Sequence, residues 1–318
     1  MLKKHPATPS TPEAACGKAF WIDLLDPTPD EAASIAGEFG VRVPSRAALQ
    51  EIETSSRIRA EGQTLYVSMP LASRDETSTF VPEPLGFVLS PEVLVTIRYS
   101  ELNAFAAAEA RMQDGTHTCS AAVFVALLEG LVDLGADALE KLAADLASVS
   151  TRAFNKLPTQ RARHKLIAAS LRQSLEQVGS AGDQLSRFRE SHLGLQRISG
   201  FVTDAANDWM PAEFKARLQT VRQDLRSLID YEEHLFAKTQ FLLDATLGLI
   251  STEQNEIFKV LTIVSVVGVP PTLIASLYGM NFHAMPELNW EYGYPYALGL
   301  IALSTILPII WFKRRGWW

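Results

Sequence analysis

Cysteine is scarce in this chain of 318 residues, which has only Cys16 and Cys119. The two residues form no CxxC pair, so the sequence argues against a disulfide framework and favours a reducing compartment. The six histidines are scattered along the chain, and the sequence contains no glycine-rich phosphate loop and no nucleophile motif. We therefore expect neither an enzyme nor a tightly bound cofactor.

Positive charge is also in short supply, with 29 Lys and Arg against 36 Asp and Glu and a net charge of −7. Residues 258–318 are slightly basic, so the acidic excess falls on residues 1–257. An acidic surface argues against nucleic acid as a partner, because phosphate binding requires a basic face. It instead raises the local concentration of cations.

Charged residues are missing altogether from two stretches, residues 260–278 and 294–312. Each stretch has 19 residues, which is about the length needed to cross a bilayer. We predict a transmembrane hairpin with helices over about 258–280 and 294–312. Aromatic residues of the kind found at membrane–water interfaces flank the second stretch at both ends. They are Trp290, Tyr292, Tyr294, Tyr296, Trp311, Phe312, Trp317 and Trp318.

Basic residues flank this hairpin on one side only. Lys259 precedes the first stretch and Lys313-Arg314-Arg315 follow the second, while the segment between the two stretches has no Lys or Arg. The positive-inside rule then places both termini in the cytoplasm and the connecting segment outside, in an inner-membrane protein. Two buried helices of a soluble core are the alternative, which the aromatic belts and the charge asymmetry disfavour.

The rest of the chain has the pattern of a cytoplasmic α+β protein. Residues 1–17 are rich in proline and poor in apolar residues, so we predict that they are disordered. Residues 18–115 alternate short β-like runs with helical patterns, which predicts a small α/β domain. Residues 116–257 carry apolar residues at i+3 and i+4 spacing, which predicts a helical bundle and a long stalk helix.

A heptad pattern marks the stalk helix. Apolar residues fall seven apart at Phe214, Val221, Leu228, Leu235, Leu242 and Leu249. No proline interrupts residues 212–269, so we expect one helix to continue from this seam into the first membrane stretch. The alternative is an ordinary helical bundle with its own core.

One face of the first membrane helix is mildly polar. It carries, three or four residues apart, Asn255, Phe258, Thr262, Ser265, Val269, Thr272 and Ser276. Such a stripe suits a pore lining, but small hydroxyl residues are also favoured where helices pack, and the spacing alone leaves both readings open. A single hairpin encloses no pore, so a transporter of this kind has to assemble from several copies. Pro270 and Pro271 are expected to kink the helix.

The triplet Gly279-Met280-Asn281 begins the segment that connects the two membrane stretches. Asn281 supplies a neutral amide oxygen, and in a ring of copies several such oxygens would converge on one ion. Mg²⁺ sheds its water reluctantly, so hard neutral oxygens that contact a hydrated ion suit it. The triplet therefore predicts an ion-contacting site at the outer mouth of a pore.

These residues resemble a known family. The segments Tyr278-Gly279-Met280-Asn281-Phe282, Met285-Pro286-Glu287-Leu288, Trp290 and Gly293-Tyr294-Pro295, with the basic, Trp-terminated tail, are similar to the CorA family of divalent-cation transporters, which includes the zinc-transporting ZntB branch. Residues 21–23, 95–98, 244–247 and 255–262 extend the resemblance more weakly. It covers most of residues 18–318.

The resemblance implies a homopentameric funnel in which the first membrane helix lines the pore. It implies that Gly279, Met280 and Asn281 form the outer selectivity site and that Asn255 lies at the inner entrance. The implied hydrophobic constrictions are Phe258, Leu261 and Val269, and the implied polar rings are Thr272 and Ser276, to which the stripe adds Thr262 and Ser265.

Asp244 matches a position that helps to bind a regulatory cation between subunits in magnesium-gated members. A solvated surface charge is the alternative for this residue. At the outer mouth, Glu287 and Glu291 remain as acids that attract cations.

The chain also departs from the family pattern. Many members carry an acid two residues after the Asn of the motif, where this chain has His283. Imidazole suits Zn²⁺, Co²⁺ and Ni²⁺ better than Mg²⁺, so His283 either weakens the preference for Mg²⁺ or is an exposed histidine without a role. Phe258 is bulkier than the Met often found at that constriction.

The predicted function is transport of a divalent metal cation across the inner membrane by self-assembled copies, with Mg²⁺ first and Co²⁺, Ni²⁺ and Zn²⁺ as further candidates. A Zn²⁺ transporter of the ZntB type is one alternative. A membrane-anchored helical scaffold or sensor is the alternative from another class. The expected partners are further copies of the chain, the lipid bilayer and divalent cations.

Overall fold

The computed structural model describes residues 2–6, 20–51, 53–74, 80–113, 119–155, 163–281, 285–286 and 290–317. They fall into two compact units, Met1–Lys156 with Ser174–Leu243 and Leu157–Gln173 with Asp244–Trp318. The first unit contains a β-sheet, one long helix, most of a second and the first part of a third. The second contains two apolar helical segments.

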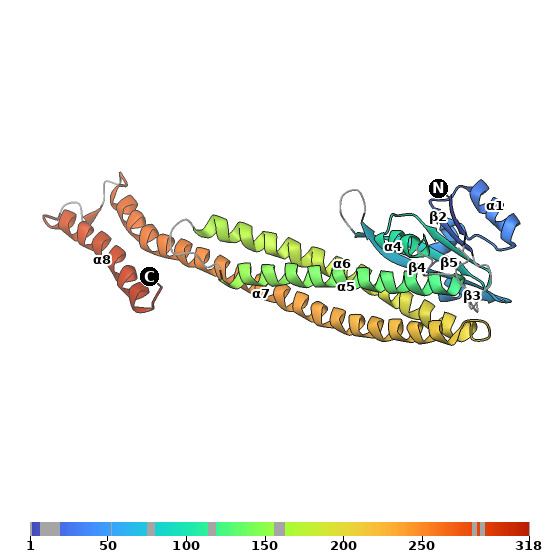
Figure 1. Ribbon diagram of the computed structural model, residues 1–318. Coiled ribbons are helices and arrows are strands. Elements are labelled where there is room, and N and C mark those ends of the chain that lie inside the picture. The colour runs from blue at the N-terminus through green and yellow to red at the C-terminus, as the bar shows by residue number, and fades with distance from the viewer. Residues whose placement is uncertain are drawn as a thin grey trace. The chain divides into compact units, whose positions relative to one another are not determined.

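A six-stranded mixed sheet is the centre of the first unit (Figure 1). Its strands are β1 (Leu2–Pro6), β2 (Phe20–Leu25), β3 (Ile58–Glu61), β4 (Thr64–Arg74), β5 (Phe80–Leu89) and β6 (Val93–Arg98). They lie in the order β1-β2-β6-β5-β4-β3, with β2 and β6 parallel and the other neighbours antiparallel. Four short helices accompany the sheet, α1 (Pro29–Phe39), α2 (Arg46–Leu49), α3 (Thr54–Arg57) and α4 (Asn103–Gln113). The mixture of sheet and helices confirms the predicted α+β class.

The start of the chain differs from the prediction. Residues 1–17 are predicted to be disordered, yet Leu2–Pro6 form β1, an edge strand antiparallel to β2. Lys3 and Lys4 anchor this strand through ion pairs with Glu109 and Glu38. Local composition misses such a strand, because its backbone hydrogen bonds are made with β2, which is distant in the sequence. Residues 7–19 lie outside the described part of the chain.

A buried polar network joins β2 to β6. The register of the parallel pair places Asp23 opposite Thr96. The carboxylate of Asp23 accepts hydrogen bonds from Thr96 Oγ1 at 2.7 Å and from Arg98 Nη2 at 2.8 Å. The Arg98 and Asp23 side chains are only 9% and 4% exposed, and Trp21 Nε1 donates to Thr96 Oγ1 at 3.1 Å. The loss of one partner from this buried pair would leave the other charge uncompensated, so the network ties β2 to β6.

Three long helices pack together in the first unit: α5 (Ser120–Asn155), α6 (Arg163–Ala205) and the first part of α7 (Ala212–Tyr278). Figure 1 shows them running side by side. Val221, Leu235 and Leu242 of the predicted heptad seam are buried in cores that α7 shares with α5 and α6. The long helix is therefore present as predicted, and the first part of its seam is filled by helices of the same chain.

A buried histidine lies between these helices. His192 Nδ1 on α6 is 2.7 Å from Glu232 Oε1 on α7, and the two side chains are 2% and 0% exposed. On α5, Gly135 leaves room for the ring, because a Cβ atom at this position would lie 2.1 Å from His192 Nε2. The glycine therefore allows α5 to approach the buried pair.

We expect Gly135→Ala to destabilise the first unit by about 1–3 kcal/mol, because the added methyl group overpacks against a buried ring. Gly179→Ala on α6 is the matched control, since nothing lies within 4 Å of a Cβ there and Ala is the better helix former. Thermal unfolding of both variants, followed by circular dichroism, measures the difference. A midpoint for Gly135→Ala at or above that of the wild type would contradict the close approach.

Candidate functional site

Two helical segments of the second unit are long and apolar enough to cross a membrane, the last part of α7 and α8 (Gly293–Arg314). The 22 residues of α8 give it a length of about 33 Å. This length matches a hydrocarbon core about 30 Å thick. No residue in the most apolar window of α7 is buried within the chain. An apolar surface of this kind needs lipid or other helices to cover it.

The predicted pore-lining residues share one exposed surface of α7. They are Asn255, Phe258, Leu261, Thr262, Ser265, Val269, Thr272 and Ser276. On the opposite face, Ile263, Val267 and Ile274 are half-buried. The structure thus leaves the mildly polar face open along its whole length.

Two threonines on this face bond back to their own helix. Thr262 Oγ1 donates to the Phe258 carbonyl at 2.8 Å, and Thr272 Oγ1 donates to the Val269 carbonyl at 2.8 Å. Because each hydroxyl hydrogen is engaged by the backbone, the lone pairs of the oxygen remain as acceptors. The two side chains therefore present acceptor oxygens, which suit a cation or the water around it.

The helix continues without interruption through Pro270 and Pro271, where a kink is predicted. Neither proline has the N–H that would bond to a carbonyl one turn earlier, at Val266 and Val267. These two carbonyls therefore lack their usual helical partners, about one and a half turns before Thr272.

The triplet Gly279-Met280-Asn281 comes directly after the last residue of α7. Gly279 N donates to the Ala275 carbonyl at 3.0 Å, so helical bonding reaches into the triplet. A Cβ atom at Gly279 would lie 3.2 Å from the Ala275 oxygen and 3.5 Å from the Ser276 oxygen, which is crowded. The glycine leaves the carbonyls of the last turn uncovered, next to the exposed side chains of Met280 and Asn281.

Aromatic side chains gather at both ends of α8. Before its first turn, the ring of Trp290 lies 5.7 Å from that of Tyr296. In its last turn, Phe312 lies 5.1 Å from Trp311 and 5.3 Å from Trp317. Aromatic groups at the two ends of an apolar helix are typical of a segment that spans from one membrane interface to the other.

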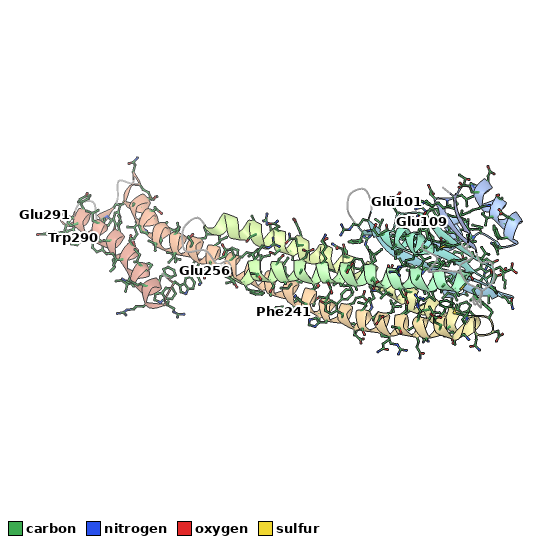
Figure 2. All side chains as sticks on the ribbon, viewed as in Figure 1. Glu101, Glu109, Phe241, Glu256, Trp290 and Glu291 are labelled. Atoms are coloured by element: carbon green, nitrogen blue, oxygen red, sulfur yellow. The ribbon has the colours of Figure 1, made fainter. Side chains whose placement is uncertain are left out.

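Charged side chains flank the apolar segments. Glu256 and Lys259 form an ion pair at 2.6 Å on α7, and Glu291 is exposed just before α8 (Figure 2). The prediction used Lys259 for orientation and missed its pairing, although i, i+3 spacing on a helix is a usable signal for an ion pair. Asp244 is exposed on α7, two residues before the buried Thr246.

Two of the predicted site residues, His283 and Glu287, lie outside the described part of the chain. Within the described part, no group of three or more His, Cys, Asp and Glu side chains is placed to hold a metal ion. What α7 presents along its open face is a series of hydroxyl, amide and carbonyl oxygens. Oxygen groups of this kind can contact a hydrated cation through its water.

Comparisons with known proteins agree on one family. Residues 17–314 match a family model described as CorA-like Mg²⁺ transporter protein. The chain is 32% identical over 301 residues to the magnesium transport protein CorA of Haemophilus influenzae, covering 94% of this chain and 92% of that protein.

Two solved structures have a similar fold. The complete structure of the CorA magnesium transporter from Methanocaldococcus jannaschii aligns with a TM-score of 0.76 at 18% identity, covering 100% of this chain and 99% of that one. The ZntB cytoplasmic domain from Vibrio parahaemolyticus aligns with a TM-score of 0.59 at 11% identity, covering 79% of this chain and 98% of that one. At these identities the likeness concerns the fold alone.

Proposed function

Because the chain belongs to the CorA-like Mg²⁺ transporter family, we propose that it carries divalent cations, with Mg²⁺ first among them, across the inner membrane. Membership places the chain with transport proteins and not with enzymes, as the sequence predicts. The observation that carries the proposal is the open face of α7, an apolar helix with a line of hydroxyl and amide groups that ends at Gly279-Met280-Asn281.

Five copies are proposed to surround one pore, each turning this face of α7 inward. Gly279, Met280 and Asn281 then ring the outer mouth, and Asn255 rings the inner entrance. Polar rings form at Thr262, Ser265, Thr272 and Ser276, and hydrophobic constrictions form at Phe258, Leu261 and Val269. The large exposed fractions of the constriction residues, 62%, 59% and 60%, support this arrangement, since apolar groups left open on one chain are available to close a pore between several.

The orientation follows from charge. Lys259, before the membrane part of α7, and Lys313-Arg314-Arg315, at the end of α8, are proposed to lie in the cytoplasm. Glu287 and Glu291 then lie outside, where they attract cations to the mouth. Asp244 is proposed to help bind a regulatory cation on the cytoplasmic side, which its exposed position on α7 allows.

A cysteine at the pore face tests this assignment. We expect that treatment with a positively charged methanethiosulfonate lowers the Mg²⁺ flux of Thr272→Cys at least about tenfold, in a background without Cys16 and Cys119. The reagent reacts with the thiolate, which forms only where water reaches the sulfur. Uptake into proteoliposomes before and after treatment measures the effect.

Val264→Cys is the matched control, because Val264 is also exposed on one chain but lies away from the polar face. Its flux should not respond to the reagent. Inhibition of Val264→Cys without inhibition of Thr272→Cys would show that another face of α7 lines the pore.

The identity of the metal is proposed to depend on His283. Near the outer mouth, an imidazole group binds Zn²⁺, Co²⁺ and Ni²⁺ better than a carboxylate group at the same position would. We expect His283→Glu to weaken the inhibition of Mg²⁺ flux by Zn²⁺, Co²⁺ and Ni²⁺. The half-inhibitory concentration of these metals should rise about tenfold, which corresponds to about 1.4 kcal/mol. Side-by-side competition in liposomes measures this change, and unchanged competition would mean that His283 has no role in selection.

A further inference from the structure

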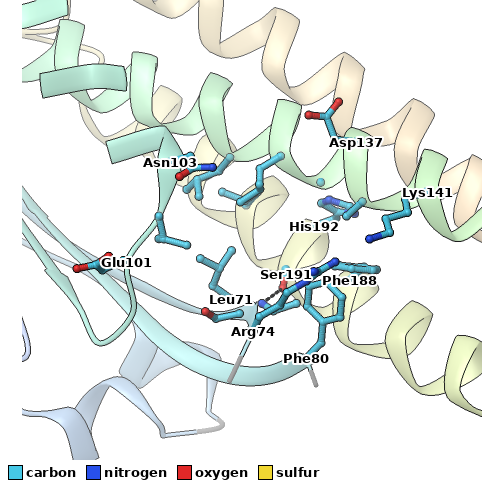
Figure 3. Close-up of a pocket in the computed structure, with 18 residues that line it drawn as sticks. Leu71, Arg74, Phe80, Glu101, Asn103, Asp137, Lys141, Phe188, Ser191 and His192 are labelled. Carbon is cyan, nitrogen blue, oxygen red and sulfur yellow. Dashed lines mark hydrogen bonds between the residues drawn. The ribbon is translucent and has the colours of Figure 1, made fainter. Parts of the chain in front are cut away.

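A cleft of about 350 Å³ opens in the first unit, far along the sequence from the proposed pore residues. It lies among the end of β4, the segment 101–103 that leads into α4, and the facing sides of α5 and α6 (Figure 3). Apolar side chains form much of its wall, including Leu71, Leu131 and Leu195. A volume of this size matches a small organic molecule.

Two cationic side chains lie at one end of the cleft. Figure 3 shows Arg74, Lys141 and His192 at this end, with Asp137 on the same side as Lys141, while Glu101 lies at the other end. The Arg74 guanidinium carbon is 4.9 Å from the centre of the Phe80 ring, which holds the planar group over an aromatic face. Within the described part of the chain, neither Arg74 nor Lys141 forms an ion pair. Two cationic side chains are thus left without an anionic partner at the same place.

His192 adds a polar ring that is fixed in position. Its Nδ1 is bonded to Glu232, and it is 2% exposed. Its other nitrogen, Nε2, has no hydrogen-bond partner among the described residues. A carboxylate on one ring nitrogen fixes the orientation of the ring. The ring lines the cleft from a position that packing against Gly135 cannot easily change.

These features favour an anion and disfavour a metal cation. The guanidinium and the ammonium group would repel a divalent cation, and neither can act as a metal ligand while charged. An arginine fork on β4 and a lysine on α5 suit the oxygens of a phosphate monoester. Of the two acidic groups that line the cleft, Glu101 lies at the other end, whereas Asp137 lies about one helical turn before Lys141 on α5.

We propose that this cleft binds a small organic phosphate, with the phosphate group on Arg74 and Lys141 and its apolar or planar body along the leucine walls. The site belongs to the first unit of one chain, so the proposal does not depend on transport. A ligand that joins β4, α5 and α6 would also stabilise the packing of the sheet against the helices.

Isothermal titration of the full chain in detergent tests the proposal, with phenyl phosphate and AMP as probes and inorganic phosphate and benzoate as comparators. We expect at least one of the two probes to bind with one site per chain and at least about tenfold more tightly than either comparator. Arg74→Gln and Lys141→Gln should each weaken this binding by about tenfold or more. Both side chains are exposed, so both variants should keep the wild-type unfolding midpoint.

Arg226→Gln is the matched control, since Arg226 is an exposed cation on α7 outside the cleft, and its affinity should equal that of the wild type. Three results would overturn the proposal. They are no binding of either probe at millimolar concentration, equal affinity for inorganic phosphate or benzoate, and unchanged binding by both Arg74→Gln and Lys141→Gln.

Discussion

Asn281→Ala should reduce Mg²⁺ flux by on the order of a hundredfold or more while the protein still assembles in the membrane. Each copy loses one amide oxygen that contacts the ion or its water, a contact worth about 0.5–1.5 kcal/mol. In a ring, the loss is repeated in every copy, so the contributions add at a single point of the path. Dye-reported uptake into proteoliposomes measures the flux.

Asn289→Ala is the matched control, because it removes the same side chain from the segment between the two apolar stretches without touching the triplet. It should keep at least half of the wild-type flux. Wild-type flux in Asn281→Ala would remove the triplet from the proposed outer site. Chromatography in detergent must show the same assembly for both variants and the wild type.

Arg98→Met should destabilise the first unit by about 3–5 kcal/mol, because it leaves the buried Asp23 carboxylate without its charged partner. Thr96 and Trp21 would lose part of the same network. Chemical unfolding, followed through tryptophan fluorescence and far-ultraviolet circular dichroism, measures the loss. A second change, Asp23→Leu, should recover much of the stability, since an apolar pair replaces an unpaired charge.

The matched control is Arg189→Met. Arg189 also pairs with a carboxylate, that of Glu233 at 3.0 Å, but the two side chains are 33% and 63% exposed. Exposed pairs contribute about 0–1 kcal/mol, so this variant should unfold close to the wild type. If Arg98→Met and Arg189→Met had equal effects, the network between β2 and β6 would not be a determinant of stability.

The sequence is informative where the physical signal is local. The length of α7 follows from an unbroken heptad pattern and the absence of proline over residues 212–269. The start of α1 is equally local, because Thr28 and Glu31 form the reciprocal hydrogen bonds of a capping box three residues apart. The open face of α7 follows from the period of a single helix. In each case the residues that decide the structure are close together in the chain.

Prediction fails where the decisive contact is distant. β1 forms because its backbone pairs with that of β2. The composition of residues 1–17 does not indicate that this edge of the sheet is available for pairing. The pairing of His192 with Glu232 spans 40 residues and appears in the sequence only as a polar residue in an apolar seam. The cleft between β4, α5 and α6 depends on how three elements pack, which no single pattern encodes.

Copies of this chain are proposed to carry Mg²⁺ through a membrane. This is measured most directly as Mg²⁺ entry into liposomes that contain the purified full chain and a Mg²⁺-sensitive dye, compared with protein-free liposomes. We expect uptake that is faster than in protein-free liposomes and that saturates as external Mg²⁺ rises. Uptake equal to that of protein-free liposomes, with the chain shown to be inserted and assembled, would contradict it.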